Sequence, residues 1–240
     1  MANEYHVLLH WLYVGVMAAG AITFVIMRAN PRGVPGYEYL IAIIIPTWSG
    51  LAYMSMALGQ GMTEVGGQIT FYARYLDWVV TTPLLLLALS LTAMFYVPKN
   101  FTIIATIMIT DVIMILTGLI ADFSLGINRF IWYSIGMAAL VIILYIIWSP
   151  LYRIAKSQGR RLRQVYVRVA AYLSALWVGY PLTWLIGPSG LGMVGQNVDT
   201  FLFIVLPIFS KVGFSILDLT SLRSLYGKQR EKIILKEKHA

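Results

Sequence analysis

Long apolar stretches alternate with short polar linkers along the whole chain. Seven such stretches can be marked, each close to the roughly 20 mostly apolar residues that a membrane-crossing helix needs. They cover residues 5–27, 37–58, 69–96, 101–120, 129–151, 165–186 and 198–222. The linkers are rich in glycine, proline and asparagine, which favour turns. The pattern predicts an all-α membrane protein, a bundle of seven transmembrane helices.

The composition agrees with lipid as the solvent. Of the 240 residues, 59% are hydrophobic and only 12% are charged, whereas a soluble domain has about 25% charged residues. We expect one membrane domain over residues 1–226 and a basic tail over residues 227–240. Because the chain has no cysteine, it can form neither a disulfide nor a thiolate metal site. We also expect no metal site from His6, His10 and His239, because they do not cluster in the sequence.

The net charge of +8 follows the predicted topology. All but three of the 18 lysines and arginines gather around the first, third and fifth linkers and in the C-terminal tail. With seven spans these segments share one side, which the positive-inside rule assigns to the cytoplasm. We therefore expect a multi-pass protein of the cell membrane, with its N-terminus outside and its C-terminus cytoplasmic. The tail fits either a topological flank or a contact with anionic lipid or a soluble partner; we expect no nucleic-acid partner.

Two of the remaining basic residues, Arg74 and Lys211, lie inside predicted spans. An ionisable side chain there costs at least ~2.5–3.5 kcal/mol, so a functional role is expected. Lys211 fits either a structural ion pair or an amine that forms a Schiff base. Asp77 is the best candidate counter-charge, and Thr81 shares its helix face four residues later. Arg74, three residues before Asp77, joins this face, and we expect it to stabilise the Asp77 carboxylate.

Aromatic side chains gather at the same depth of the predicted bundle. Trp177, Tyr180 and Trp184 recur at helical spacing and so share one face. Such a stripe also occurs in ordinary cores, but here prolines interrupt this helix and three other spans. Prolines within a span free backbone carbonyls and shape kinks and cavities. The other aromatic members of the predicted box around the lysine and the aspartate are Tyr53, Trp78 and Tyr133.

Three motifs carry a resemblance to a known family: RYLDWVVTTPLL at residues 74–85, WVGYPLTW at 177–184 and SKVGF at 210–214. Together they make the chain similar to the microbial rhodopsins over essentially its whole length. The resemblance implies that Lys211 binds all-trans retinal as a Schiff base, with Asp77 as the primary counterion. It also implies a homo-oligomer, since trimers are common in the family. The expected retinal-binding residues besides Lys211 are Tyr53, Trp78, Thr82, Met114, Gly118, Tyr133, Gly136, Trp177, Tyr180, Trp184 and Pro207.

Within this family the chain most resembles the xenorhodopsins and Anabaena sensory rhodopsin. Residues 30–35 (NPRGVP), 48–53 (WSGLAY) and 199–203 (DTFLF) carry this narrower resemblance. So does Pro207, because most relatives have a second counterion aspartate at that position. We therefore expect a single carboxylate, Asp77, close to the Schiff base.

Residues in the cytoplasmic half favour inward proton transport. Outward pumps of the family have a carboxylic proton donor eleven residues after the counterion, and this position is Ala88 here. Asp218 lies seven residues after Lys211, about 10 Å nearer the cytoplasm on the same face, and is the expected proton acceptor. Glu38 is expected to assist it. Both acids also fit a bland interpretation as solvated helix-end carboxylates.

The leading hypothesis is thus a light-driven inward proton pump of the xenorhodopsin type. The alternative is a photosensor that signals through a soluble transducer, because a sensor and a pump can share every pocket residue. A halide pump is less favoured, since those relatives generally lack a carboxylate at the Asp77 position. We expect a transporter or a sensor and no enzyme.

Two further acids lie in the outer half and in the fourth span. Asp199 occupies the usual proton-release site of the family, but Ser189 stands at the position of its usual acidic companion. Asp199 fits either that role or a cap at the N-terminus of the seventh helix. Asp111 is expected to hydrogen-bond Thr82 and to hold two helices together.

Overall fold

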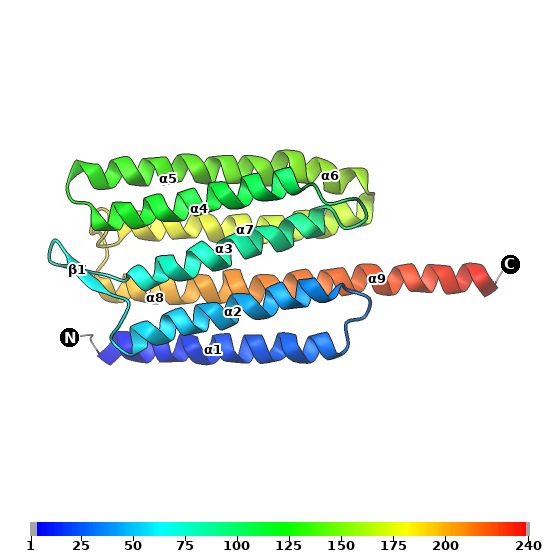
Figure 1. Ribbon diagram of the computed structural model, residues 1–240, viewed down its shortest axis with the longest axis horizontal. Coiled ribbons are helices and arrows are strands. Elements are labelled where there is room, and N and C mark those ends of the chain that lie inside the picture. The colour runs from blue at the N-terminus through cyan, green and yellow to red at the C-terminus, as the bar shows by residue number, and fades with distance from the viewer. Residues whose placement is uncertain (1–3, 239–240) are drawn as a thin grey trace.

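Seven helical spans pack side by side in the computed structural model of the protein (Figure 1). The structure describes residues 4–238, with side chains through residue 226. Four spans are single helices: α1 (Glu4–Ala29), α2 (Gly36–Ala57), α3 (Tyr72–Ala93) and α4 (Phe101–Phe123). The fifth span joins α5 (Ile127–Ile146), a π-helix (Ile147–Leu151) and α6 (Tyr152–Ser157). The sixth is α7 (Arg160–Ile186), and the seventh joins α8 (Gln196–Pro207), a π-helix (Ile208–Gly213) and α9 (Phe214–Lys238).

The predicted seven-helix membrane fold is confirmed, since all seven spans are long and apolar enough to cross a bilayer. The fifth and sixth helices extend beyond their apolar stretches into the basic segment between them, up to Ser157 and from Arg160. Lysine and arginine are good helix formers, so the helices continue where hydropathy ends. The backbone of the predicted tail continues α9 to Lys238, whereas the tail side chains and residues 239–240 lie outside the described part.

The predicted start of the third span at residue 69 is wrong. Two short antiparallel strands, β1 (Thr63–Val65) and β2 (Gln68–Thr70), precede α3 instead. Gly66 and Gly67 connect them with φ angles of 59° and 80°. Two positive φ angles in a two-residue loop match the twist of a tight hairpin, and glycine adopts them without strain. The hairpin lies at the same end of the bundle as the N-terminus (Figure 1).

The opposite end of the bundle carries the linker between α1 and α2, the corner between α6 and α7, and the C-terminal end of α9 (Figure 1). These are the basic segments of the sequence, so they gather at one end, as the seven-span pattern requires. Which side of the membrane this end faces stays a prediction from the positive-inside rule.

Helix α3 is the most enclosed span and therefore shields its polar side chains from lipid. Its apolar window is 72% buried within the protein, against 28–44% for the other six. The seventh span contributes Lys211 from its π-helical segment, and this segment begins directly after Pro207. Single π-helical turns are rare and frequently occur at functional sites. These two spans bring the candidate residues together.

Candidate functional site

Lys211 and Asp77 form an ion pair between the seventh span and α3, and both side chains are fully buried. The Lys211 ammonium also donates a hydrogen bond to Ser49 Oγ at 2.8 Å. The prediction that Asp77 is the partner of the buried lysine is therefore confirmed. A buried charge needs such compensation, because an unpaired one costs several kcal/mol.

The Asp77 carboxylate accepts two further hydrogen bonds. Thr81 Oγ1 donates to Oδ1 at 3.1 Å, as their shared helix face predicted, and Ser49 Oγ donates to Oδ2 at 2.9 Å. Ser49 also lies 2.6 Å from Tyr13 OH. A hydroxyl has one proton to donate and accepts the rest, so Tyr13 donates to Ser49. Ser49 and Tyr13 were missed from the sequence, although Ser49 stands in the WSGLAY motif.

Arg74 pairs with Asp199 of α8 rather than with Asp77. Its Nη1 donates to Asp199 Oδ2 at 3.1 Å, and both side chains are buried. The guanidinium lies over the rings of Phe71 and Phe203, 4.5 and 4.7 Å from their centroids, a cation–π arrangement. The side-chain contacts of Arg74 thus go to α8, and its predicted stabilisation of the Asp77 carboxylate stays a prediction. Its long side chain reaches past its own helix face to the neighbouring helix.

Asp199 does not cap the seventh helix. The N-cap of α8 is Gly195, with no side-chain hydrogen bond, and Asp199 lies one turn further along. Its carboxylate accepts from Arg74 and, at 3.5 Å, from Gln196 Nε2. The capping interpretation is therefore wrong. Asp199 instead forms a buried ion pair with Arg74 in the half of the bundle that carries the hairpin.

At the basic end of the bundle, Asp218 and Glu38 are both buried, 3% and 4% exposed. Thr92 Oγ1 donates to Asp218 Oδ1 at 2.7 Å, and Glu38 Oε2 has no hydrogen-bond partner. The interpretation of these acids as solvated helix ends is therefore wrong. Lys99, in the linker between α3 and α4, is close enough that the Glu38 charge acts on it. Burial lowers the pKa of Lys99, and the Glu38 carboxylate opposes that shift.

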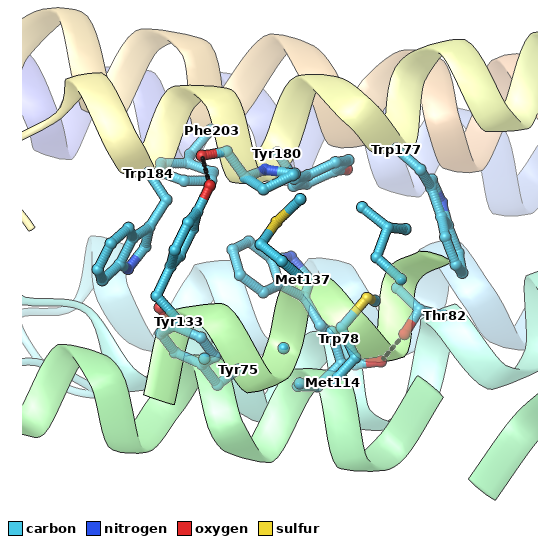
Figure 2. Close-up of a pocket in the computed structure, with 15 residues that line it drawn as sticks. Tyr75, Trp78, Thr82, Met114, Tyr133, Met137, Trp177, Tyr180, Trp184 and Phe203 are labelled. Atoms are coloured by element: carbon cyan, nitrogen blue, oxygen red, sulfur yellow. Dashed lines mark hydrogen bonds between the residues drawn. The ribbon is translucent and has the colours of Figure 1, made fainter. Parts of the chain in front are cut away.

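An aromatic cavity lies between α3, α4, α5, α7 and α8 (Figure 2). Nine of the residues predicted for the retinal pocket line it: Trp78, Thr82, Met114, Gly118, Tyr133, Gly136, Trp177, Tyr180 and Trp184. The lining residues that were missed are Tyr75, Ile115, Met137, Leu140, Pro181 and Phe203. These apolar or aromatic side chains lie on the same five helices. Each lies three or four residues, or about one helical turn, from a predicted pocket residue, so helical periodicity would have identified it.

Tyr53, Pro207 and Lys211 are not among the residues that line the cavity. Tyr53 is fully buried and donates to Phe203 O at 2.7 Å, and Pro207 directly precedes the π-helix. The cavity nevertheless reaches the neighbourhood of the lysine. Tyr180 of the cavity wall lies 2.7 Å, hydroxyl to hydroxyl, from Ser210, which adjoins Lys211. Trp78 of the wall adjoins Asp77.

Two buried carboxyl groups of α4 support the cavity wall. Thr82 Oγ1 donates to Asp111 Oδ2 at 2.7 Å, which confirms the predicted tie between α3 and α4. Asp122 accepts hydrogen bonds from Tyr75 and Trp184, at 2.9 and 2.8 Å. Asp122 was missed from the sequence, because nothing in its local pattern indicates partners on two other helices.

Comparison with known proteins gives concordant matches over the chain. The family described as "Bacteriorhodopsin-like protein" matches residues 4–225. Archaerhodopsin-3 of Halorubrum sodomense is 36% identical over 225 residues, covering 90% of this chain and 85% of its own. Bacteriorhodopsin of Halobacterium salinarum is 34% identical over 226 residues, covering 91% and 84%.

Solved structures agree with these matches. The thermophilic rhodopsin from Rubrobacter xylanophilus superposes with a TM-score of 0.88 at 37% identity, covering 92% of this chain and 97% of its own. The light-driven proton pump Coccomyxa subellipsoidea rhodopsin gives a TM-score of 0.84 at 29% identity, covering 92% and 98%.

Proposed function

The chain belongs to the bacteriorhodopsin-like family of microbial rhodopsins, and from this premise we propose that it is a light-driven inward proton pump with retinal on Lys211. Members of this family bind retinal through a lysine Schiff base, and the chain is a multi-pass protein of the cell membrane. The attachment residue, the all-trans isomer and the direction of transport are the proposed part.

The residues present fit retinal. Lys211 is a fully buried lysine of the seventh span, and its amine is enclosed beside a carboxylate. The adjoining cavity has an almost wholly apolar wall of aromatic rings, which suits a long hydrocarbon chain. Gly118 and Gly136 keep this wall open on α4 and α5, where side chains would crowd Tyr75 and Thr117. When bound, retinal would absorb light and change the geometry of one double bond.

The protein's own groups hold and move the proton at Lys211 Nζ. Asp77 balances the positive charge there, while Ser49 and Thr81 hold the carboxylate in place. Toward the end that carries the hairpin, the path continues to the Arg74–Asp199 pair. We propose that this end faces outside and that reprotonation enters through it.

A single observation carries the inward direction: the half of the bundle at the basic end offers a proton acceptor but no donor at the usual position. Asp218 is buried without a cation in contact and accepts one hydrogen bond from Thr92. The corresponding position on α3 holds Ala88, whose methyl group carries no exchangeable proton. Because Asp218 is about 10 Å along the helix from Lys211, transfer between them needs bridging water or side-chain movement.

Illuminating cells or sealed vesicles and recording the external pH tests the proposal. An inward pump makes the external medium more alkaline, and a protonophore abolishes the change. Lys211→Ala is the control for responses that do not depend on the chromophore. External acidification under light would overturn the inward direction.

The second candidate is a photosensor that signals through a soluble transducer. The basic end of the bundle supports it, because Arg160, Arg161 and Arg168 are exposed there and complement an acidic partner. A photocycle without any light-induced pH change would favour the sensor. A homotrimer stays a prediction from the family and is tested by the mass of the purified protein in detergent.

A further inference from the structure

Asp122 is a buried carboxyl group whose position needs a reason. It lies in the last turn of α4 and is 7% exposed. The free carbonyl groups at the C-terminus of a helix carry partial negative charge, which disfavours a carboxylate there. An acidic side chain within a span is also costly. Among the residues with described side chains, the ion pairs are Arg74–Asp199 and Lys211–Asp77. Asp122 belongs to neither, so hydrogen bonds alone compensate its burial.

Those hydrogen bonds come from two walls of the aromatic cavity. Tyr75 OH of α3 donates to Oδ2 at 2.9 Å, and Trp184 Nε1 of α7 donates to Oδ1 at 2.8 Å. Each carboxyl oxygen thus holds one ring, and the indole has no other group with which to form a hydrogen bond. Both rings line the cavity, and Figure 2 shows them on the same side of it as Tyr133.

The positions of these two rings also constrain the neighbouring aromatic side chains. Trp184 stacks on Tyr133, with centroids 4.6 Å apart and planes 13° apart. Tyr75 packs edge-on against Trp78 at 5.0 Å. Gly118, one turn before Asp122 on α4, lets Tyr75 lie close: a Cβ there would be 3.2 Å from Tyr75 Cε1. One carboxyl group therefore sets the position of four aromatic side chains from three helices.

We propose that Asp122 is a positioning residue of the retinal pocket, a two-point anchor that fixes Tyr75 and Trp184 and thereby the shape of the cavity. This inference rests on the proposed binding of retinal but not on the direction of proton transport. Asp122 acts through the two rings, so its effect depends on their hydrogen-bonding groups.

Asp122→Leu tests the anchor, because leucine has the same branched shape as aspartate but accepts no hydrogen bond from Tyr75 or Trp184. We expect the purified protein to bind added all-trans retinal about tenfold more slowly, which corresponds to ~1.4 kcal/mol, comparable with the net contribution of one to two ordinary hydrogen bonds. We also expect a shift of its absorption maximum. The same substitution in a Tyr75→Phe, Trp184→Phe background should add little to either change.

Ser124→Ala is the matched control. It removes a side-chain hydrogen bond at the same end of α4, from Ser124 Oγ to Ile120 O at 2.7 Å, and Ser124 does not line the cavity. We expect it to lower thermal stability slightly without reproducing the spectral shift. A merely structural Asp122 would behave like this control.

The inference is overturned if Asp122→Leu binds retinal at the normal rate with an unchanged spectrum, or if its effect is as large without the two donors as with them. Should Asp122→Leu not fold, Tyr75→Phe and Trp184→Phe decide instead, since each removes one hydrogen bond and must shift the spectrum. If the unmodified protein itself gains no visible absorption with retinal, the proposed function falls as well.

Discussion

Along the proposed proton path, the two halves of the bundle bury their carboxyl groups in opposite ways. In the half with the hairpin, Asp77 and Asp199 each contact a cation, Lys211 and Arg74. In the half with the basic linkers, Asp218 has one hydroxyl partner, and Glu38 Oε2 has none. A paired carboxylate stays charged and fixes geometry, whereas an unpaired one is less costly in its neutral form. The first half is thus suited to hold charge and the second to exchange protons.

Lys211→Ala should have the largest effect, because it removes both the proposed attachment site and the cation of the paired half. We expect complete loss of visible absorption with retinal and of every light response. Absorption spectra of the purified protein with added retinal measure this. Lys99→Ala, which removes an amine outside the spans, should leave the colour intact; equal losses in both variants would argue against a role specific to Lys211.

Asp77→Asn should come next, because it leaves the buried ammonium without a counter-charge. Breaking a buried ion pair from one side costs about 3–5 kcal/mol, so the melting temperature should fall clearly. The absorption maximum should move to longer wavelength, since the carboxylate stabilises positive charge at Nζ in the ground state. Thr81→Val leaves the ion pair intact and removes only the hydroxyl that donates to the carboxylate and the backbone carbonyl of Asp77, so it should change both quantities much less.

Asp218→Asn tests the unpaired half. We expect a normal colour but light-driven proton uptake at least about a hundredfold slower, the lower limit for a positioned acid–base group. The rate of external alkalinisation in vesicles measures it. Thr92→Val keeps the carboxyl and removes only its hydrogen bond, so it should reduce the rate less. Undiminished transport by Asp218→Asn would show that the unpaired acid is not the acceptor.

Glu38→Gln should have the smallest effect on transport. Glu38 is buried near the same end but has no direct contact with Lys211 or Asp77. We expect roughly a threefold slower rate, equivalent to ~0.6 kcal/mol, with an unchanged spectrum. Tyr37→Phe, at the half-exposed position beside it, is the control. A larger loss than that of Asp218→Asn would reverse the order of the two acids along the path.

The sequence predicts the contacts that follow from spacing along one helix, but not those that depend on how different helices pack together. The Asp77–Lys211 pair and the stripe of Trp177, Tyr180 and Trp184 follow from helical spacing and from the cost of burying charge. The partner of Arg74 does not, because its side chain is long enough to reach another helix. The bonds of Asp122 join residues 47 and 62 positions away, and no local pattern encodes such distances.

In each half of the bundle, the sequence pattern failed to indicate one structural feature. The hairpin was hidden because residues 63–70 are too short to show a strand pattern, and only the Gly66–Gly67 pair indicates the turn. Burial of Asp218 and Glu38 was hidden because acids near a predicted helix end are usually solvated. The structure buries them because α2, α3 and α9 pack against one another.

The π-helix around Lys211 sets the rotational phase of the seventh span. A regular α-helix turns by about 100° per residue, and a π-helical turn accommodates one residue more than an α-helical one. If residues 208–213 formed a regular α-helix instead, α8 would therefore be rotated against α9 by about that angle. Asp199 of α8 and Asp218 of α9 would then no longer both face the interior. The seventh span therefore consists of two helices with a fixed rotation between them. A designed chimera should be joined outside residues 208–213.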